Sequence, residues 1–191
     1  VSFSSFTSAS SMSTARRNSG GAGTQTAALC FGGFTPPSNF FTDTESYNGS
    51  GWSSAPALVD GKQGGANSGT STAALYAGGQ IAPGQPGYTN QSEEYNGSAW
   101  AEGNNLNTTR YGLAGFGTQT ASVAACGYGG GTYTTSVEEY DGTSWTSVNS
   151  TASPGVEDPN GAGVSQTAGW IAGGAPGPKA TTQEYDGTNW T

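Results

Sequence analysis

Glutamates recur at similar places along this sequence and are the first candidates for chemistry. Four similar segments each hold a glutamate shortly before a tyrosine, and we take Glu45, Glu94, Glu139 and Glu184 as the matched set, with Glu93 and Glu138 beside two of them. Two carboxylates that face the same glycosidic bond can hydrolyse it. Carboxylates that occur once per repeated unit are spread over the units instead. We therefore expect each one to bond backbone or a neighbouring basic residue.

Histidine is absent from the sequence, and its absence removes several kinds of site. There is no imidazole acid, base or metal ligand, and no nucleophile activated by histidine. The two cysteines, Cys30 and Cys126, fall in strands that we expect to be equivalent in units one and three. We expect both to be free and buried, because a disulfide needs Cα atoms within about 7 Å. We expect no catalytic residue, no metal and no cofactor.

The charge of the chain narrows the choice of partners. Five basic residues against 13 acidic ones give a net charge of -8, which argues against binding of nucleic acid. No apolar run approaches the roughly 18 residues of a membrane helix, so we expect no membrane insertion. The chain starts at Val1 and shows no signal peptide, which favours a processed protein or a piece of a longer one.

The composition predicts a β-protein. Leu, Ile, Val and Phe together number 21 of 191 residues, which is too few for an ordinary helical or α/β core. Glycine contributes 33 residues and aromatic residues 11% of the chain. A glycine-rich, polar chain with aromatic side chains is typical of many short strands joined by turns.

Tryptophans mark an internal repeat. Four of them are 48, 45 and 45 residues apart, and each follows a tyrosine by five positions: Tyr47 and Trp52, Tyr95 and Trp100, Tyr140 and Trp145, Tyr185 and Trp190. A second block ends in paired glycines upstream of each tyrosine: Gly32 and Gly33, Gly78 and Gly79, Gly129 and Gly130, Gly173 and Gly174. Two blocks that recur at a fixed spacing predict four copies of one structural unit.

Each unit of about 47 residues predicts four short strands. The run of small and apolar residues before the glycine pair predicts a buried strand, and the glycines allow close packing or a turn. The Glu-Tyr strand and the strand that begins with tryptophan are separated by Asn-Gly or Asp-Gly. This dipeptide predicts a hairpin in which both central residues adopt positive φ. The fourth strand lies before the next Gly-Thr-Gln-Thr. We expect the tyrosine and tryptophan rings to fill space between units.

The glycine pair, the Glu-Tyr step and the following tryptophan resemble the kelch repeat, although the spacing from tyrosine to tryptophan is shorter here. The resemblance spans almost the whole chain, 1–191, and implies a single β-propeller domain in which neighbouring blades bury one another's faces. The motif GTQTAAL before a glycine pair and the motif EYDGTSW after one are similar to sequences of kelch-like proteins of marine phages. Those proteins are associated with virion structure, tail fibres and capsid surfaces.

The two ends of the chain predict how the ring closes. Residues 1–17 resemble the stretch after tryptophan in a unit, such as residues 101–110, and the chain ends at Trp190 and Thr191, where that stretch begins. We therefore expect the two ends to complete one blade and close a four-bladed ring without free edges. The alternative is that the chain is a segment of a larger or open array.

The segments after the glycine pairs differ most between units. They are residues 34–43, 80–91, 131–136 and 175–182. Loops held by a rigid scaffold are where binding residues concentrate, and aromatic rings beside Gly, Asn and Thr make adaptable contact surfaces. The candidate ligand-binding residues are Phe34, Phe40, Phe41, Tyr88 and Tyr133. The alternative is that these loops only pack on one another.

Together these features indicate a non-catalytic structural and interaction module at a virion surface or outside the cell, such as a tail fibre or a capsid decoration. Its expected partners are other virion proteins, a host-surface glycan or receptor, or further copies of itself. The first alternative is a glycan-binding lectin or receptor-binding adhesin. The second, less favoured, is a glycosidase or lyase that uses Asp or Glu.

Overall fold

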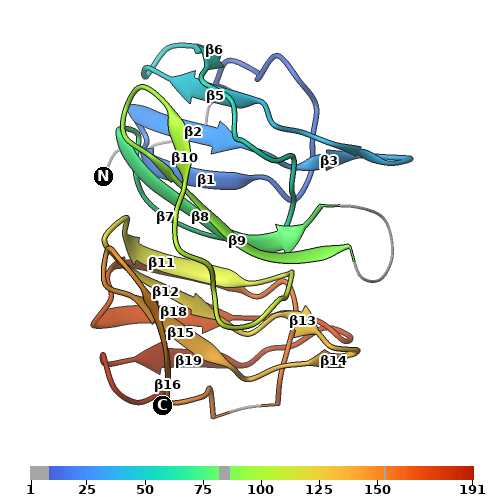
Figure 1. Cartoon of the computed structure of the whole chain (residues 1–191), viewed down its shortest axis with the longest axis vertical. Helices are drawn as coiled ribbons and strands as arrows, with labels where there is room; N and C mark the ends of the chain where they lie inside the picture. Colours follow the sequence, from blue (N-terminus) through green and yellow to red (C-terminus); the bar gives the residue numbers. More distant parts are fainter. Residues whose placement is uncertain (1–8, 82–86, 153) are drawn as a thin grey trace, which may run out of the picture.

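The computed structural model describes residues 9–81, 87–152 and 154–191, and these residues form strands but no helix (Figure 1). Four antiparallel sheets stand in a ring around one axis, so the chain is a four-bladed β-propeller, as the repeat predicts. In the described ranges there is accordingly no helix of a length and apolarity that would cross a membrane.

Each sheet is one blade, and strand order within it follows the chain from the axis outward. Blade 1 consists of β1 (Gly20–Thr24), β2 (Ala27–Phe31), β5 (Thr44–Tyr47) and β6 (Trp52–Ala55). Blade 2 consists of β7 (Ala66–Thr70), β8 (Ala73–Gln80), β9 (Tyr88–Tyr95) and β10 (Trp100–Glu102). Blade 3 consists of β11 (Ala114–Thr118), β12 (Ala121–Ala125), β15 (Val137–Tyr140) and β16 (Trp145–Val148). Blade 4 consists of β17 (Asn160–Ser165), β18 (Ala168–Ala172) and β19 (Thr182–Tyr185).

The innermost strands line the axis and are rich in glycine. Strand β1 contacts β7, β7 contacts β11, and β11 contacts β17. A Cβ atom on Gly115 would lie 2.4 Å from the backbone nitrogen of Asn67 in the neighbouring blade. Only glycine therefore allows β11 to approach β7 this closely.

Backbone hydrogen bonds run around the axis from blade to blade. The amide of Gly64 donates to the carbonyl of Asn18 at 3.0 Å, Gly112 donates to Gly64 at 2.7 Å, and Asp158 donates to Gly112 at 2.8 Å. No bond between Asn18 and Asp158 completes the circle among the described residues. The ring therefore has three bonded seams between neighbouring blades and a fourth of different character, between blades 4 and 1.

The predicted glycine pair is confirmed in blades 1, 2 and 4, but the prediction is wrong for blade 3. Gly32 and Gly33 adopt φ values of 62° and 99°, and the matching pairs of blades 2 and 4 behave alike. In blade 3 the pair with these angles is Cys126 and Gly127, at 61° and 105°, not Gly129 and Gly130. The two predicted glycines belong to the hairpin of β13 (Tyr128–Gly129) and β14 (Thr132–Tyr133). Cys126 therefore matches Gly32 and not Cys30, although both cysteines are free and buried as expected.

The Asn-Gly and Asp-Gly hairpins are confirmed, but their turn type differs from the prediction. Tyr47 pairs with Trp52, which leaves a loop of four residues in which Gly49 alone has positive φ, at 92°. Asn48 does not need positive φ because its side-chain oxygen accepts the amide hydrogens of Ser50 and Gly51, both at 3.0 Å. This Asx turn replaces the tight two-residue turn.

Blade 4 departs from the others at one position of its inner strand. Gly23, Gly69 and Gly117 have φ values near 100° at the position that Val164 holds in blade 4. A β-branched residue adopts such angles only with strain. The register of β17 and β18 shifts between Ala162 and Ser165, and the side chain of Val164 is 91% exposed.

The C-terminal residues begin a fourth strand in blade 4. Trp190 pairs with Tyr185, and Thr191 exchanges two backbone hydrogen bonds of 2.9 Å with Glu184. Residues 1–8, to which we assigned part of the ring closure, lie outside the described residues. Residues 9–17 contact blade 1, where the Ser10 hydroxyl donates to the carbonyl of Ser50 at 2.6 Å.

Candidate functional site

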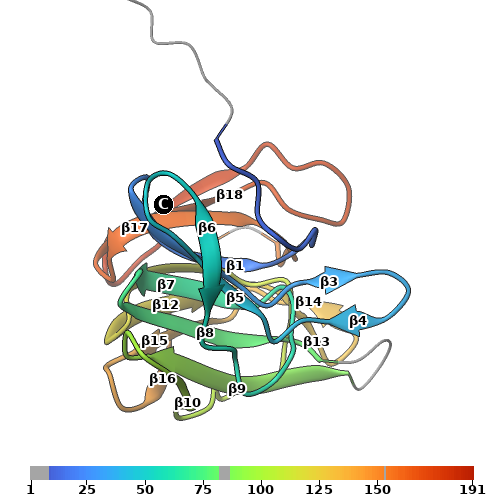
Figure 2. The same cartoon turned by 90° about the horizontal axis from the view of Figure 1, so that it is seen from above.

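The segments that follow the glycine pairs lie together at one end of the ring, which we call the loop face. Hairpin β13–β14 and the hairpin of β3 (Phe34–Thr35) and β4 (Asn39–Phe40) project from this end in two perpendicular views (Figures 1 and 2). Of the predicted loop 80–91, residues 82–86 lie outside the described residues. The five predicted ligand-binding residues share this face but divide into two groups.

Phe34, Phe40 and Phe41 belong to blade 1 and serve mainly to pack its hairpin. The rings of Phe34 and Phe40 lie 5.0 Å apart, and Phe34 is only 7% exposed. The guanidinium of Arg17 lies 5.2 Å from the Phe34 ring, and that of Arg16 lies 5.4 Å from the Phe41 ring. These contacts favour the alternative of loop packing for this group.

Tyr88 and Tyr133 belong to a second group, in which four half-buried rings form a continuous surface that we call the tyrosine cluster: Tyr88, Tyr111, Tyr128 and Tyr133. Tyr88 stacks on Tyr111 with 4.5 Å between ring centroids. Tyr128 lies 6.1 Å from Tyr88, 5.9 Å from Tyr111 and 5.1 Å from Tyr133. The cluster spans blades 2 and 3, so it depends on the seam between them.

Sequence analysis missed two members of this cluster. Tyr111 directly follows the basic residue Arg110, and Tyr128 lies in the glycine-rich run whose glycine pair was predicted three residues too far along the chain. The two pair as an isolated β-bridge, and a matching bridge joins Arg17 to Phe34 in blade 1. A sequence pattern could have identified both tyrosines. The residue that follows each basic residue pairs with the residue that follows each glycine pair, and in blade 3 both of these residues are tyrosines.

Tyr111 is also tied to blade 4. Burial raises the pKa of its phenol, and a hydrogen bond to the carboxylate of Glu157 raises it further. Oε2 of Glu157 is buried and has no hydrogen-bond partner among the described residues. The raised pKa keeps the phenol of Tyr111 protonated and neutral.

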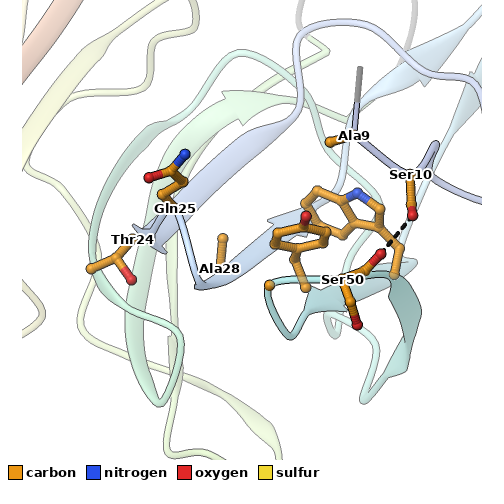
Figure 3. A pocket seen from close by; sticks show the side chains of 9 residues that line it. Ala9, Ser10, Thr24, Gln25, Ala28 and Ser50 are labelled. Atoms are coloured by element: carbon orange, nitrogen blue, oxygen red, sulfur yellow. Dashed lines mark hydrogen bonds between the residues drawn. The ribbon is translucent and has the colours of Figure 1, made fainter. Parts of the chain in front are cut away.

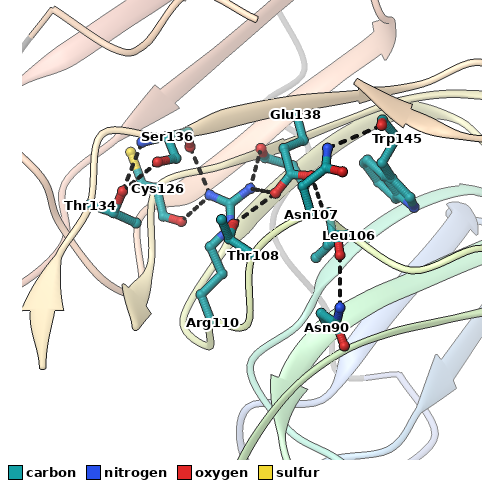
Figure 4. Close-up of polar contacts among 11 residues, drawn as sticks. Asn90, Leu106, Asn107, Thr108, Arg110, Cys126, Thr134, Ser136, Glu138 and Trp145 are labelled. Carbon is teal, nitrogen blue, oxygen red and sulfur yellow. Dashed lines mark hydrogen bonds and ion pairs between the residues drawn. The ribbon is translucent and has the colours of Figure 1, made fainter. Parts of the chain in front are cut away.

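A buried ion pair in blade 3 shows how the repeated glutamates are used (Figure 4). Arg110 and Glu138 are each 1% exposed, with 3.1 Å between Nη2 and Oε1. Nη1 of Arg110 donates to the carbonyls of Cys126 at 2.6 Å and Ser136 at 2.7 Å. The backbone amide of Asn107 donates to the other oxygen of Glu138 at 2.6 Å. Burial lowers the pKa of Arg110, and the charge of Glu138 opposes that shift.

The same arrangement occurs in blades 1 and 2. Lys62 Nζ lies 2.8 Å from Glu93 Oε1, and Arg16 Nη2 lies 2.5 Å from Glu45 Oε1. The backbone amide of Val59 donates to Glu93 at 2.6 Å. Burial lowers the pKa of Lys62, while the carboxylate of Glu93 raises it. As expected, these glutamates bond backbone amides and a basic residue of the preceding connection.

The matched set of glutamates needs a correction. The buried, paired position is held by Glu45, Glu93 and Glu138, so Glu45 does not match Glu94, Glu139 and Glu184. Those three occupy the following position, one residue before each tyrosine. Two of them join blades: the Tyr140 hydroxyl donates to Glu94, and the Tyr185 hydroxyl donates to Glu139 at 2.8 Å. The carboxylates therefore serve two structural positions, not one.

Three of the four tyrosine–tryptophan pairs fill the seams, as predicted. Trp100, Trp145 and Trp190 are 6–7% exposed and belong to the three hydrophobic clusters of the core, each of which joins two neighbouring blades. Tyr47 and Trp52 of blade 1 are only half-buried and belong to none of these clusters. They face the fourth seam, between blades 4 and 1.

This fourth seam lacks hydrogen bonds that two of the other seams have, within the part of the chain that the structure describes. Gln119 reaches back to the carbonyls of Ala74 and Tyr95, and Gln166 reaches back to those of Ser122 and Tyr140. Gln25, at the same place in blade 1, makes no such hydrogen bond to a described residue. On the other side of the seam, Trp170 of blade 4 is 41% exposed.

A cavity of about 620 Å³, lined by residues of blade 1 and by Ala9 and Ser10, opens on the side of blade 1 that faces this seam (Figure 3). The rings of Tyr47 and Trp52, 5.1 Å apart, form one wall. Gln25, Ser10 and Ser50 contribute polar groups to the lining. The cavity lies at the hairpin-turn end of blade 1, opposite the loop face. It is the second candidate site, and it was not predicted because the four aromatic pairs look equivalent in the sequence.

The described residues hold no group of three or more Cys, Asp or Glu side chains arranged to bind a metal ion. The two candidate sites are therefore an aromatic surface and an uncharged cavity, whose chemistry is contact and hydrogen bonding. Comparison of the sequence with models of known protein families gives no match, and comparison with curated proteins gives none.

Proposed function

We propose that this chain is a non-catalytic structural and interaction module that binds its partner through the loop face. The observation that carries the proposal is the tyrosine cluster. Its four half-buried tyrosine side chains belong to segments that differ between blades, and the rigid propeller holds them in place. Tyrosine gives a large contact area for little loss of side-chain entropy and offers a hydroxyl for hydrogen bonding.

The bonding of the glutamates supports a non-catalytic role. Glu45, Glu93 and Glu138 each accept hydrogen bonds from backbone amides and pair with a buried cation. Glycosidases need two carboxyl groups that face one bond across a cleft, roughly 5–10 Å apart. Here the buried carboxylates lie in separate blades, and each is fully engaged by the hydrogen bonds and the ion pair of its own blade.

The proposed identity is a kelch-like repeat protein of a virus particle, exposed as a tail-fibre or capsid-decoration module. Support comes from the glycine pairs, the Glu-Tyr steps and the tryptophans, and from a net charge of -8 that disfavours nucleic acid as a partner. The partner at the loop face is then another virion protein or a receptor on the host surface.

The test compares the full chain with a triple variant of the tyrosine cluster, Tyr88→Ser, Tyr128→Ser and Tyr133→Ser. Immobilised protein is probed with separated virion proteins and with arrayed host-surface receptors and glycans. We expect saturable binding that the triple variant loses and that Val164→Ser, at an exposed site on another part of the ring, retains. Steady release of reducing sugar from a glycan by the purified chain would instead establish an enzyme.

A further inference from the structure

The cavity on the side of blade 1 that faces blade 4 has an aromatic wall, formed by Tyr47 and Trp52. The rings of Trp100 and Phe31 pack edge to face with 4.8 Å between their centroids, and the indole nitrogen of Trp100 donates to the Thr44 hydroxyl of the preceding blade at 3.1 Å. Trp52 has no such neighbour among the described residues, so its ring and that of Tyr47 remain open to the cavity. Among the described residues, no other aromatic ring packs on Trp52 or Tyr47, so both can contact a ligand.

The polar groups of the cavity are uncharged. Its lining contains Gln25, Thr24, Ser10 and Ser50 together with small residues, but no lysine, arginine, aspartate or glutamate. The amide of Gln25 offers two donor hydrogens and an acceptor oxygen, and it has no hydrogen bond to a described residue. A ligand that suits this lining carries many hydroxyl groups and no net charge.

We propose that this cavity binds a neutral saccharide of one or two sugar units. A volume of about 620 Å³ lies within the range of small-molecule sites, and such sites combine an apolar wall with a few directed polar groups. The hydrogen-bearing face of a pyranose ring packs on Trp52 and Tyr47, because aromatic faces carry partial negative charge. The amide of Gln25 donates to and accepts from the sugar hydroxyls at the edge. The Ser50 oxygen, whose own hydrogen is donated to Asn48 Oδ1, accepts a hydrogen bond from one of them.

This site is separate from the loop face. It lies at the hairpin-turn end of blade 1 (Figure 3), whereas the tyrosine cluster lies on the loop face of blades 2 and 3. The saccharide site and the proposed interaction function can therefore fail independently. The triple variant of the tyrosine cluster should bind the saccharide with unchanged affinity.

The experiment titrates the full chain with glucose, galactose, mannose, N-acetylglucosamine and their β1,4-linked disaccharides, with sialyllactose as the charged comparison. Indole N–H signals in NMR spectra report each tryptophan separately. We expect at least one neutral sugar to shift the Trp52 signal saturably while the signals of Trp100 and Trp145 stay in place. Trp52→Ala and Gln25→Ala should each weaken binding about tenfold by calorimetry, which is about 1.4 kcal/mol.

Gln166→Ala is the matched control, because it removes the same side chain from a closed seam and should leave the affinity unchanged. The proposal is overturned if no neutral sugar shifts the Trp52 signal, or if only sialyllactose does. It is also overturned if a chain that begins at Ala9 shows a changed Trp52 signal before sugar is added and gains sugar binding that the full chain lacks. In that case the chain itself fills the cavity.

Discussion

Gln183 of blade 4 stands where Glu138 stands in blade 3, and both accept a backbone amide of the preceding connection. The Ala152 amide donates to Gln183 Oε1 at 2.7 Å, as the Asn107 amide donates to Glu138. Val156 meanwhile holds the place of Arg110, since its carbonyl accepts the amide of Gly127 just as the Arg110 carbonyl accepts that of Gly79. Blade 4 therefore has two neutral residues, Val156 and Gln183, at the positions where blade 3 has the buried ion pair of Arg110 and Glu138.

This substitution predicts how the ion pair of blade 2 responds to mutation. Lys62→Met leaves Glu93 buried without its cation, which should cost about 3–5 kcal/mol of unfolding free energy. The double variant Lys62→Met with Glu93→Gln reproduces the neutral chemistry of blade 4 and should recover at least half of that loss. Urea denaturation near neutral pH measures both. A double variant as unstable as the sum of the single variants would contradict the prediction.

Glu45 should make stability depend on pH in the acid range. Burial alone would raise its pKa, but hydrogen bonds from the Ser13 and Thr14 amides and from Arg16 hold it below the usual value of 4.5. Its contribution is thus complete above that value and disappears as the pH falls through the lower folded-state pKa. We expect Glu45→Gln to destabilise the protein more at neutral pH than at about pH 3. Equal losses at both pH values, by denaturation at fixed ionic strength, would rule this out.

The glutamines of the inner hairpins predict a difference between seams. Gln166→Ala removes two hydrogen bonds to the carbonyls of Ser122 and Tyr140 and should cost about 1–3 kcal/mol. Gln25→Ala removes none to a described residue and should change stability by less than about 0.5 kcal/mol. Thermal unfolding compares the two variants directly. Similar losses in both would show that Gln25 clamps its seam as the others do.

The inner strand of blade 3 should not tolerate the residue that blade 4 carries. A Cβ atom on Gly117, at φ 106°, would lie 2.3 Å from the carbonyl oxygen of Ala121. We expect Gly117→Val to lose more than about 2 kcal/mol, whereas Val164→Gly changes stability by no more than about 1 kcal/mol. Chemical denaturation of both variants checks this asymmetry, and comparable losses would refute it.

The regular spacing of the repeated tryptophans was enough to predict the propeller, because it reflects one strand arrangement that occurs four times. It failed where copies differ locally. In blade 3, Cys126 takes the backbone conformation of a glycine, and only coordinates show which residue of a glycine-rich run does so. Spacing places residues along a blade but does not report backbone angles.

The candidate sites were less accessible from sequence for the same reason. Tyr88 and Tyr133 were predicted from loop composition, but their contacts with Tyr111 and Tyr128 depend on how two blades meet. The half-buried state of Trp52 depends on a seam whose two sides lie at opposite ends of the chain. A repeat pattern describes every unit alike and therefore hides the one that differs.

The axial bonds among Asn18, Gly64, Gly112 and Asp158 all point in one rotational sense, with each later blade donating to the earlier one. Blades 2 and 3 are thus held on both sides, while blades 1 and 4 resemble the outer members of a stack. Exchange of amide hydrogens should accordingly be slowest in the middle of the chain and fastest towards its ends, because local unfolding begins at blades 1 and 4.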